Sequence, residues 1–591
     1  MRRDRTPTRT RSRVLCAWRG RRKKKAVVVS FFVAWVWVAL ACPVGVEGAT
    51  LGEDARAGGV GRARDEVGGD GVCDEGGSVL GATGAGAGVL LAGVSRERDE
   101  NLKMMRTFFA NANMTNSYLD ELAGISDSDF HLERTFLSPG SLRALASVRR
   151  WMEEAGLRVW LDSVGNLHGR LERAGGAGAG AEGGKTGEGE KLLLLGSHID
   201  TVVDGGAYDG TLGIVAAITA VKNLKLKLDS DEGLALKRPV EVIAFSDEEG
   251  LRFKSTFLGS RAVSGTFLKH GYLDARDSKG YTLSSVLETV GLSNSKEDIA
   301  KIAMKREELY GYVEVHIEQG PVLQSLNQPV GVVSAISGQT RLYVQVDGFS
   351  GHAGTVPMDQ RRDTIAASAE MIHRIEKDCK AFPLSRENML VCTVGEFNVF
   401  PGASNVIAGY SNFSIDIRCK DDTMREEVVD LVRVSLKDIA ARRSVDCNIE
   451  TKHNAESCQS SPVFTESLRK GIIGAHSFAK RYEEARQVSS SVDPAEAVGG
   501  DGKGKEGESS ILWEMDEASV PVIASGAGHD ALAMSEVTPI GMLFVRCRDG
   551  ISHSPLEFVE PRDVTIASLS LFHFLVAEAL VDRTTSHSNA A

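Results

Sequence analysis

The stretch LLLLGSHIDTVVDGGAYDGTLG, residues 192–213, decides the fold class. An uninterrupted run of leucines before a Gly-rich turn predicts a strand of a parallel sheet, because such strands are buried on both faces and apolar throughout. In open α/β folds, ligands bind in the crevice at the carboxyl ends of these strands. His198, Asp200 and Asp209 follow the leucines at that place. They are either metal ligands or turn-forming residues.

Other segments repeat the pattern of an apolar strand followed by polar residues. Apolar runs predict strands at Val240–Phe245, Tyr312–Ile317 and Ile540–Val545. Thr211–Leu226 predicts a helix, and strands that alternate with helices indicate a mixed or parallel sheet covered by helices. The sequence therefore predicts an α/β fold with a mostly parallel sheet flanked by helices.

Residues 341–450 have a different pattern. Leu342–Val346 and Phe413–Ile417 alternate between apolar and polar residues, and Asp363–Cys379 has the periodicity of an amphipathic helix. This order predicts a small α+β domain inserted into the larger one. The predicted boundaries are 1–49 for a targeting segment, 50–100 for a disordered Gly-rich linker, 101–338 and 451–585 for the two parts of the larger domain, and 339–450 for the inserted domain. Low-complexity inserts are expected at 173–190, 229–237 and 488–510.

Charge is distributed unevenly along the 591 residues. Residues 1–48 carry 12 Lys and Arg against 2 Asp and Glu, so the remainder holds 57 against 78, a net charge of −21. An acidic balance of this size disfavours a nucleic-acid-binding surface.

The amino-terminal segment has the composition of a targeting signal. Basic residues at Arg21–Lys25 precede the apolar run Ala26–Ala41, which predicts a secretory signal peptide that leads to the endoplasmic reticulum. An uncleaved anchor and a plastid transit peptide are the alternatives. The run is shorter than the ~20 residues of a full span, so no stable membrane span is expected in the mature chain. Nine scattered cysteines show no paired framework, so the fold is not expected to depend on disulfides.

Two adjacent carboxylates follow the strand at Val240–Phe245, in the sequence FSDEEG of residues 245–250. Side chains alternate along an extended backbone, so Glu248 and Glu249 point in different directions. One can bind a cation while the other moves protons. A solvated turn is the alternative.

The strand YVEVHIE, residues 312–318, places a histidine between carboxylates. Period two puts Glu314, His316 and Glu318 on one face. This arrangement suits a metal ligand whose second ring nitrogen is held by an acid. A neutral core histidine is the alternative.

Two further motifs, GAGHD at 526–530 and ISHSP at 551–555, lie near the strand at Ile540–Val545. The strand-end loops of one sheet then offer three imidazoles and two carboxylates with Glu248 beside them. Such a set serves two divalent ions if one carboxylate bridges them, and it supports two-metal hydrolysis. Zn²⁺ or Mn²⁺ suits these ligands better than Ca²⁺ or Mg²⁺. The predicted ligands are His198, Asp209, Glu249, His316 and His553.

These motifs resemble the dinuclear metallopeptidases and amidohydrolases of peptidase family M20. The histidine in HIEQG, residues 316–320, is similar to that of the N-carbamoyl amidohydrolase branch, where peptidase relatives have an acidic ligand. Longer runs between about residues 105 and 580 look like plant-type allantoate amidohydrolases; they include GSHIDTV, YDGTLGI, RPVEVIAFSDEEG, GYVEVHIEQGPVL, GHAGTVPM and GMLFVRCRDGISHSP.

The resemblance implies a role for each motif. Asp209 would bridge two ions, with His198 and His316 on one and Glu249 and His553 on the other. Asp200 would orient His198 and Glu248 would be the general base, whereas Asp204 has no implied role and is predicted to form a turn. The implied substrate contacts are Gln339, His352, Asn405 and Arg418.

The implied partners follow from the same likeness. The inserted domain would be a lid and dimerisation domain of a homodimer, with His352 reaching the neighbouring subunit's site. Two divalent ions per subunit are implied, with Mn²⁺ expected and Zn²⁺, Co²⁺ or Ni²⁺ as alternatives. On the strand that ends at Arg418, Asp416 shares its face, and a planar guanidinium suits a substrate carboxylate.

The implied reaction is hydrolysis of allantoate, a small ureide, to ureidoglycine, CO₂ and ammonia. Three alternatives stay open: the same chemistry on ureidoglycolate or an N-carbamoyl amino acid such as β-ureidopropionate, an aminoacylase or dipeptidase, and a binding protein without activity. The histidine at 316 disfavours the second. The presence of every ligand and the base disfavours the third.

Overall fold

The structure is a computed structural model that describes residues 85–173, 191–386, 388–492 and 517–582. The targeting segment and nearly all of the inserts at 173–190 and 488–510 lie outside the described residues. Helix α2 (Ala85–Ala123) begins within the range predicted as a disordered linker, so that boundary was wrong. The stretch 85–93 reads AGAGVLLAG, in which alanine and leucine favour a helix and offset the unfavourable glycines among them.

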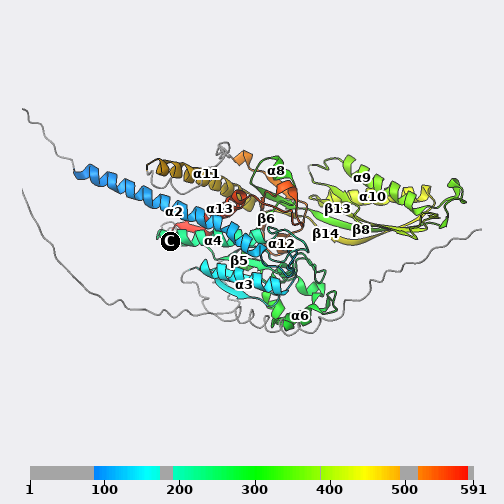
Figure 1. Cartoon of the computed structure of the whole chain (residues 1–591), viewed down its shortest axis with the longest axis horizontal. Helices are drawn as coiled ribbons and strands as arrows, with labels where there is room; N and C mark the ends of the chain where they lie inside the picture. The colour runs from blue at the N-terminus through cyan, green and yellow to red at the C-terminus, as the bar shows by residue number, and fades with distance from the viewer. Residues whose placement is uncertain (1–84, 174–190, 387, 493–516, 583–591) are drawn as a thin grey trace, which may run out of the picture. The chain divides into compact units, whose positions relative to one another are not determined.

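A nine-stranded sheet carries the larger fold unit (Figure 1). Its centre is parallel, with β5 beside β3, β3 beside β6 and β6 beside β17. Toward the edges, β2 pairs antiparallel with β5 and β1, and β7 pairs antiparallel with β17 and β15 but parallel with β16. The order across the sheet is β1 (Arg158–Leu161), β2 (Leu167–Leu171), β5 (Val240–Phe245), β3 (Leu192–His198), β6 (Leu309–Ile317), β17 (Ile540–Val545), β7 (Val330–Ile336) and β15 (Cys458–Gln459), with β16 (Val522–Ser525) on β7.

Helices cover both faces of this sheet because its central strands carry apolar side chains on both faces. Leu192 and Leu194 pack with residues of α5 (Leu258–Val263) and α12 (Asp530–Met534). The side chains between them point to the other face, where α4 (Thr211–Ser230) contacts β3 and packs with α2. Longer helices α11 (Pro462–Val492) and α13 (Pro561–Ala579) join that layer, and shorter helices are α3 (Pro139–Glu154), α6 (Leu283–Thr289), α7 (Lys296–Ile302) and α8 (Val322–Ser325). The predicted α/β fold class is confirmed.

A separate smaller sheet comes from residues 338–455. Its order is β10 (Val391–Thr393), β13 (Tyr410–Cys419), β8 (Gly338–Asp347) and β14 (Asp446–Ala455), with β11 (Phe397–Phe400) on β13. Helices α9 (Thr364–Ala381) and α10 (Asp422–Arg442) cover one face (Figure 1). Asp363 and Asp421 precede these helices and accept hydrogen bonds from backbone N–H groups of their first turns.

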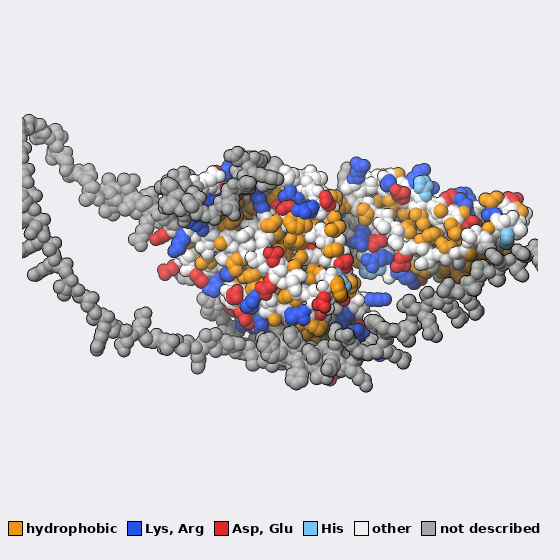
Figure 2. All heavy atoms as spheres, viewed as in Figure 1, with side chains coloured by type: hydrophobic (Ala, Val, Ile, Leu, Met, Phe, Trp, Pro, Cys, Tyr) orange, Lys and Arg blue, Asp and Glu red, His pale blue; other side chains and the backbone are white. Residues whose placement is uncertain are grey.

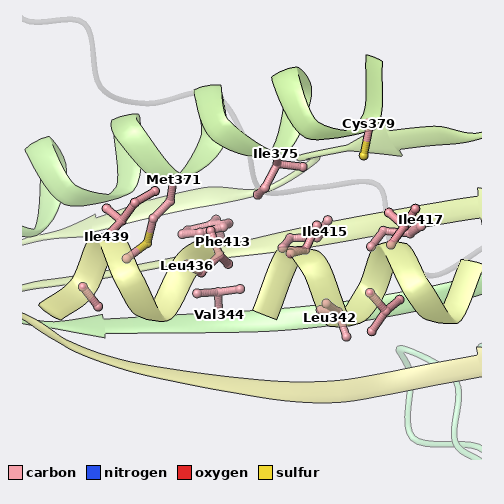
Figure 3. Packing of buried hydrophobic residues seen from close by; sticks show 14 of the residues in the cluster. Leu342, Val344, Met371, Ile375, Cys379, Phe413, Ile415, Ile417, Leu436 and Ile439 are labelled. Atoms are coloured by element: carbon pink, nitrogen blue, oxygen red, sulfur yellow. The ribbon is translucent and has the colours of Figure 1, made fainter. Parts of the chain in front are cut away.

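The core of the smaller unit forms between these helices and the sheet. Figure 3 shows Val344, Phe413 and Ile415 of the strands pointing toward Met371 of α9 and Leu436 of α10. All five side chains are fully buried. Because strand residues alternate, burial of this face leaves the polar residues of β8 and β13 on the opposite face.

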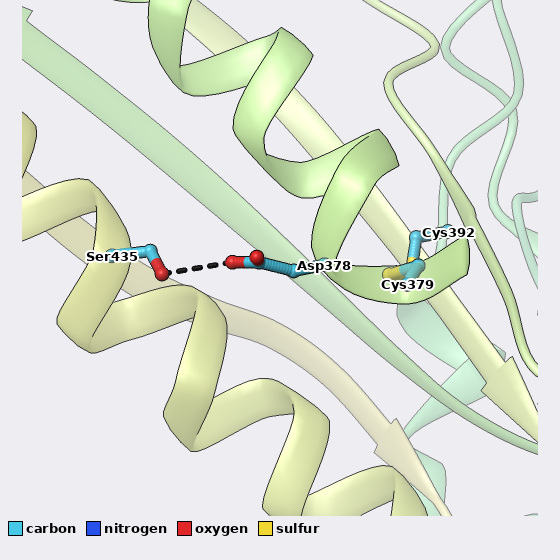
Figure 4. The surroundings of a disulfide bond; sticks show 4 residues. All are labelled: Asp378, Cys379, Cys392 and Ser435. Carbon is cyan, nitrogen blue, oxygen red and sulfur yellow. Dashed lines mark hydrogen bonds between the residues drawn. A yellow bond between two sulfur atoms is a disulfide. The ribbon is translucent and has the colours of Figure 1, made fainter. Parts of the chain in front are cut away.

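One disulfide, between Cys379 at the end of α9 and Cys392 on β10, joins a helix to the edge of the smaller sheet. The sequence did not predict this pair. Beside it, Ser435 Oγ of α10 donates a hydrogen bond of 2.8 Å to Asp378, which ties the two helices together (Figure 4).

Two small pairs of strands complete the architecture. Strand β9 (Gly351–His352) pairs with β12 (Val406–Ile407). Strand β4 (Leu234–Leu236) pairs with β18 (Leu580–Asp582), so part of the 229–237 insert is ordered.

On the face drawn in Figure 2, Lys and Arg side chains are interspersed with Asp and Glu, and this face shows no continuous basic stripe among the described residues. Among the described helices, none is long and apolar enough to cross a bilayer.

Candidate metal centre

His198 is the last residue of β3, and its side chain is buried. Its Nδ1 lies 3.1 Å from the backbone oxygen of Asp200, so a proton on Nδ1 leaves Nε2 as the coordinating atom. The loop that follows must pass close to this ring. Gly210 has φ +67° and its Cα faces the imidazole, so a side chain at this position would collide with His198.

Asp209 lies at the centre of the predicted ligands. Its Oδ1 is 3.6 Å from His198 Nε2 and 3.1 Å from His316 Nε2. Its Oδ2 is 3.2 Å from His553 Nε2, and that nitrogen is 3.3 Å from Glu249 Oε1. Two groups of nitrogen and oxygen donors, each within 4.8 Å, therefore share this one carboxylate. The donor set fits two divalent cations: His198, Asp209 and His316 would hold one, and Asp209, Glu249 and His553 would hold the other.

Asp200 links the first strand-end loop to the second. Its two carboxylate oxygens accept hydrogen bonds of 3.1 Å from the backbone N–H groups of Glu248 and Glu249. These bonds fix the turn that carries both glutamates. One oxygen of Asp200 is also 3.7 Å from His198 Nδ1, and Glu248 lies with His198 and Glu249 in a third group of donor atoms.

Several carboxyl groups are buried together in this centre, and burial disfavours their charged forms. Burial raises the pKa of Glu248 well above its ordinary value, and burial raises the pKa of Glu249 to about 7. Burial also acts against the charge of Asp209, but hydrogen bonds with three imidazoles hold the pKa of its carboxyl well below its usual range. The hydrogen bond with Asp209 raises the pKa of His553 to about 9. Divalent cations would compensate this concentration of buried acids.

The second nitrogen of His316 does not meet an acid, so that expectation was wrong. Nδ1 lies 3.0 Å from the backbone oxygen of Ile317. The flanking carboxylates accept hydrogen bonds from backbone N–H groups instead, Glu314 from Ala531 and Glu318 from the first turn of α8. The reason is local geometry, because the strand ends here and its last carbonyl turns toward the ring.

Two residues without a predicted role contact this centre. Gln319 Nε2 donates a hydrogen bond of 3.0 Å to Asp209 Oδ2 and is 3.3 Å from His553 Nε2. Glu557 Oε1 accepts hydrogen bonds from the backbone N–H groups of Tyr208 and Asp209, at 2.8 and 3.0 Å. The place of Gln319, directly after the strand, is a usable sequence signal. Nothing local in the sequence indicates Glu557.

The motif at 526–530 contributes a third buried imidazole. The ring of His529 packs 4.4 Å from that of His316, and its Nε2 is 2.8 Å from Ser525 Oγ. Burial and the neighbouring His316 lower the pKa of His529 well below its ordinary value, so this imidazole is neutral.

A cavity of about 1070 Å³ lies between the strand-end loops and the polar face of the smaller sheet. Gln319 and Gly526 line it on one side, and Arg418 lines it on the other. Gln339 contacts Asp416 in the same wall. The other two predicted substrate residues, His352 and Asn405, are exposed on or beside β9 and β12, and neither is among the described lining residues.

Asp204 is exposed in a turn and has φ +58°, as a turn-forming aspartate requires. Among the described contacts, its side chain takes no part in the centre. This answers the question raised by the aspartates of the first loop, since Asp200 and Asp209 belong to the centre.

Known proteins share this fold and much of this sequence. The chain is 43% identical to the allantoate deiminase of Arabidopsis thaliana over 474 residues, which are 78% of this chain and 81% of that protein. It is 31% identical to an N-carbamoyl-L-amino-acid amidohydrolase of Pseudomonas sp. (strain NS671), with 80% and 99% covered. Among solved structures, AtUAH in complex with glyoxylate superposes with a TM-score of 0.58 at 27% identity, covering 79% of this chain and 97% of that one.

The family model named Peptidase family M20/M25/M40 matches residues 194–577. That range contains all five predicted ligands together with Glu248 and Asp200. The predicted likeness is thereby confirmed, and the chain belongs to peptidase family M20/M25/M40.

Proposed function

We propose that this protein hydrolyses allantoate to ureidoglycine, CO₂ and ammonia. The observation that carries the proposal is the shared carboxylate of Asp209. It joins two groups of side chains that could hold metal ions, and it accepts a hydrogen bond from Gln319, which lines the same cavity as Arg418. Greater identity to allantoate deiminase than to the carbamoylase supports the choice of substrate, at 43% against 31%. The same centre acting on ureidoglycolate or an N-carbamoyl amino acid is the second candidate.

The reaction requires a general base, a group that binds the substrate carboxylate, and a Lewis acid that polarises the carbonyl group. Divalent cations held by the ligand set supply Lewis acidity toward a carbonyl oxygen and make water a stronger acid. Glu248 removes the proton from the water that attacks the ureido carbonyl carbon, and then donates it to the departing nitrogen. Its burial, which raises the pKa of the carboxyl, suits a group that must hold a proton between these steps.

The guanidinium of Arg418 binds the carboxylate of the substrate from the opposite wall. It lines the cavity and is held by Asp416, with Nε 3.1 Å from Oδ1. Two parallel N–H groups of a guanidinium match a carboxylate, so the arginine fixes the position of the ureido carbon relative to Glu248.

Ammonia release tests the function directly. The purified full-length protein is stripped of metal, resupplied with Mn²⁺ and offered allantoate, ureidoglycolate and N-carbamoylglycine in parallel. Turnover of allantoate well above the others supports the proposal. Preference for another ureide would support the second candidate function, with the same metal centre. Absence of turnover of all three compounds with metal bound would overturn both candidate functions.

The base is tested by Glu248→Gln. Turnover should fall by about 10²- to 10⁴-fold, the usual contribution of general acid–base catalysis, while bound metal stays the same. Glu297→Gln on the exposed first turn of α7 is the matched control and should behave like the wild type. Normal turnover in the Glu248 variant would remove this residue from the role.

Three further properties are part of the proposal. The ions are Mn²⁺, which suits imidazole with carboxylate ligands. The protein is a homodimer through the smaller domain, and supporting this, Phe349, Met358 and Phe400 of that domain are 72%, 78% and 69% exposed. The chain enters the secretory pathway, as its leader predicts. Metal analysis, sedimentation of the purified protein and localisation of a tagged chain test these points separately.

A further inference from the structure

Four polar side chains form a square on the cavity face of β8 and β13. The two strands are antiparallel, and their register places Gln339 opposite Arg418 and Arg341 opposite Asp416. Alternation puts all four on the face opposite the apolar core of the smaller sheet. Arg341, Asp416 and Arg418 line the cavity.

Asp416 is the centre of this square. Its carboxylate accepts hydrogen bonds from Gln339 Nε2 at 2.6 Å, from Arg341 Nε at 3.3 Å and from Arg418 Nε and Nη2 at 3.1 Å each. Burial acts against its charge, but the hydrogen bonds from Arg418 hold the pKa of Asp416 below its ordinary value, so the group is ionised. One carboxylate thus faces two guanidinium groups, and the square keeps an excess positive charge.

The two arginines differ in how many of their donors are already used. Arg418 directs Nε and Nη2 to Asp416, and its Nη1 donates a hydrogen bond of 2.8 Å to the backbone oxygen of Gly526. Arg341 has a hydrogen bond through Nε alone, and among the described residues its Nη groups have no acceptor. Its side chain is 55% exposed on the cavity wall. These donors are therefore available to a ligand.

Allantoate has a feature that its rival substrates lack. One carbon of allantoate carries the carboxylate and two ureido groups, so one ureido group stays unreacted when the other is hydrolysed. Ureidoglycolate and N-carbamoylglycine have only one ureido group. A ureido oxygen accepts hydrogen bonds, and it lies close to the carboxylate because both groups are attached to the same carbon.

We propose that Arg341 is a specificity-determining residue, which binds the non-reacting ureido group of the substrate while Arg418 binds the carboxylate. Asp416 is the positioning residue that holds both guanidinium groups at the spacing of these two substituents. The inference rests on the proposed function, since it concerns the substrate that the metal centre hydrolyses. It also explains why the wall places two arginines at diagonal positions on adjacent strands, both bonded to Asp416.

The test compares ligands with and without the second ureido group. In Arg341→Ala, KM for allantoate should rise about tenfold or more, the effect of losing a hydrogen bond from a charged donor. In the same variant, kcat should stay within about threefold of the wild-type value. Ki for N-carbamoylglycine as a competitive inhibitor should stay within about twofold of the wild-type value, because neither constant depends on the second ureido group. Arg341→Lys should be intermediate. The control Arg374→Ala, on the exposed side of α9, should change neither constant.

Asp416→Asn provides the second arm. Loss of the carboxylate releases both guanidinium groups, so KM for allantoate and Ki for N-carbamoylglycine should both rise, and Asp416→Glu should recover part of each. The inference is overturned if Arg341→Ala leaves KM for allantoate unchanged or weakens both ligands equally. Absence of allantoate turnover in the wild type would be a different result, because it would overturn the proposed function first.

Discussion

Gly210→Ala should reduce turnover far more than it reduces stability. Gly210 precedes α4 with φ +67° and ψ −54°, and a Cβ atom at this position would lie 2.5 Å from Nδ1 of His198. Ordinary contact begins at 3.4 Å. The ring or the loop must therefore move by about 1 Å, because neither is a flexible side-chain end. Either movement changes the position of His198 relative to Asp209.

The two costs can be separated in magnitude. A residue other than glycine in a sparsely populated backbone conformation costs roughly 1–3 kcal/mol of folding free energy. A misplacement of about 1 Å in a catalytic group costs about 10²-fold in rate. The variant should therefore still fold, with a midpoint of thermal unfolding lower by several degrees, and turn over about 100 times more slowly.

Gly271→Ala is the matched control. Gly271 has the same φ of +67°, with ψ 25° in the left-handed helical region, and no atom lies within 4 Å of a Cβ placed there. This variant bears a backbone cost without any displacement of a ligand. The assay measures kcat with saturating Mn²⁺, bound metal, and the midpoint of thermal unfolding for both variants. If Gly210→Ala lost stability like the control and kept wild-type kcat and metal content, the argument about His198 would be refuted.

Three further outcomes are expected. Removal of divalent metal by a chelator should abolish turnover and lower the midpoint of thermal unfolding, and added Mn²⁺ should restore both. The reason is that a ligand that binds only the folded state stabilises it. An unchanged midpoint would contradict a cation site. Replacing Cys379 and Cys392 together by Ser should lower the free energy of unfolding by about 3 kcal/mol, the chain-entropy value for the 13-residue separation, and equal urea midpoints under oxidising conditions would contradict it. Although burial opposes its charge, hydrogen bonds to Asp162 and Glu241 raise the pKa of His168 to about 9 from 6.5. Because the pKa is higher in the folded state, the protonated imidazole stabilises the fold fully below pH 6.5, and this stabilisation is lost as pH rises through 9. His168→Gln should therefore lower the free energy of unfolding by about 3 kcal/mol at pH 6 and by much less at pH 10. A difference that does not change with pH would count against the ion pairs.

The sequence by itself determined the main secondary-structure elements and the strand ends at which the candidate ligands lie. The apolar runs predicted β5 and β17 with the bounds that the structure has, and the Gly-rich turn after β3 predicted a helix that begins at Thr211. Burial of a strand or of a helix face is recorded in local periodicity, so these features need no distant partner. The motifs at the strand ends then indicated five candidate ligands, and the structure brings their donor atoms together in two groups that share Asp209.

Only the tertiary structure decided which hydrogen-bond or ion-pair partner each polar side chain has. Strand order brings β3 and β17 to either side of β6, so His198 and His553 meet the same carboxylate of Asp209. It also decided that His316 Nδ1 faces a backbone oxygen and that Glu557 holds the Asp209 loop.

The arginine square has the same origin. Alternation on each strand could place Asp416 and Arg418 on one face, but the register between β8 and β13 set Arg341 opposite Asp416. Register is a relation between segments that lie far apart in the chain, and hydrogen bonds depend on distances of a few tenths of an ångström. Periodicity within one segment carries no record of either.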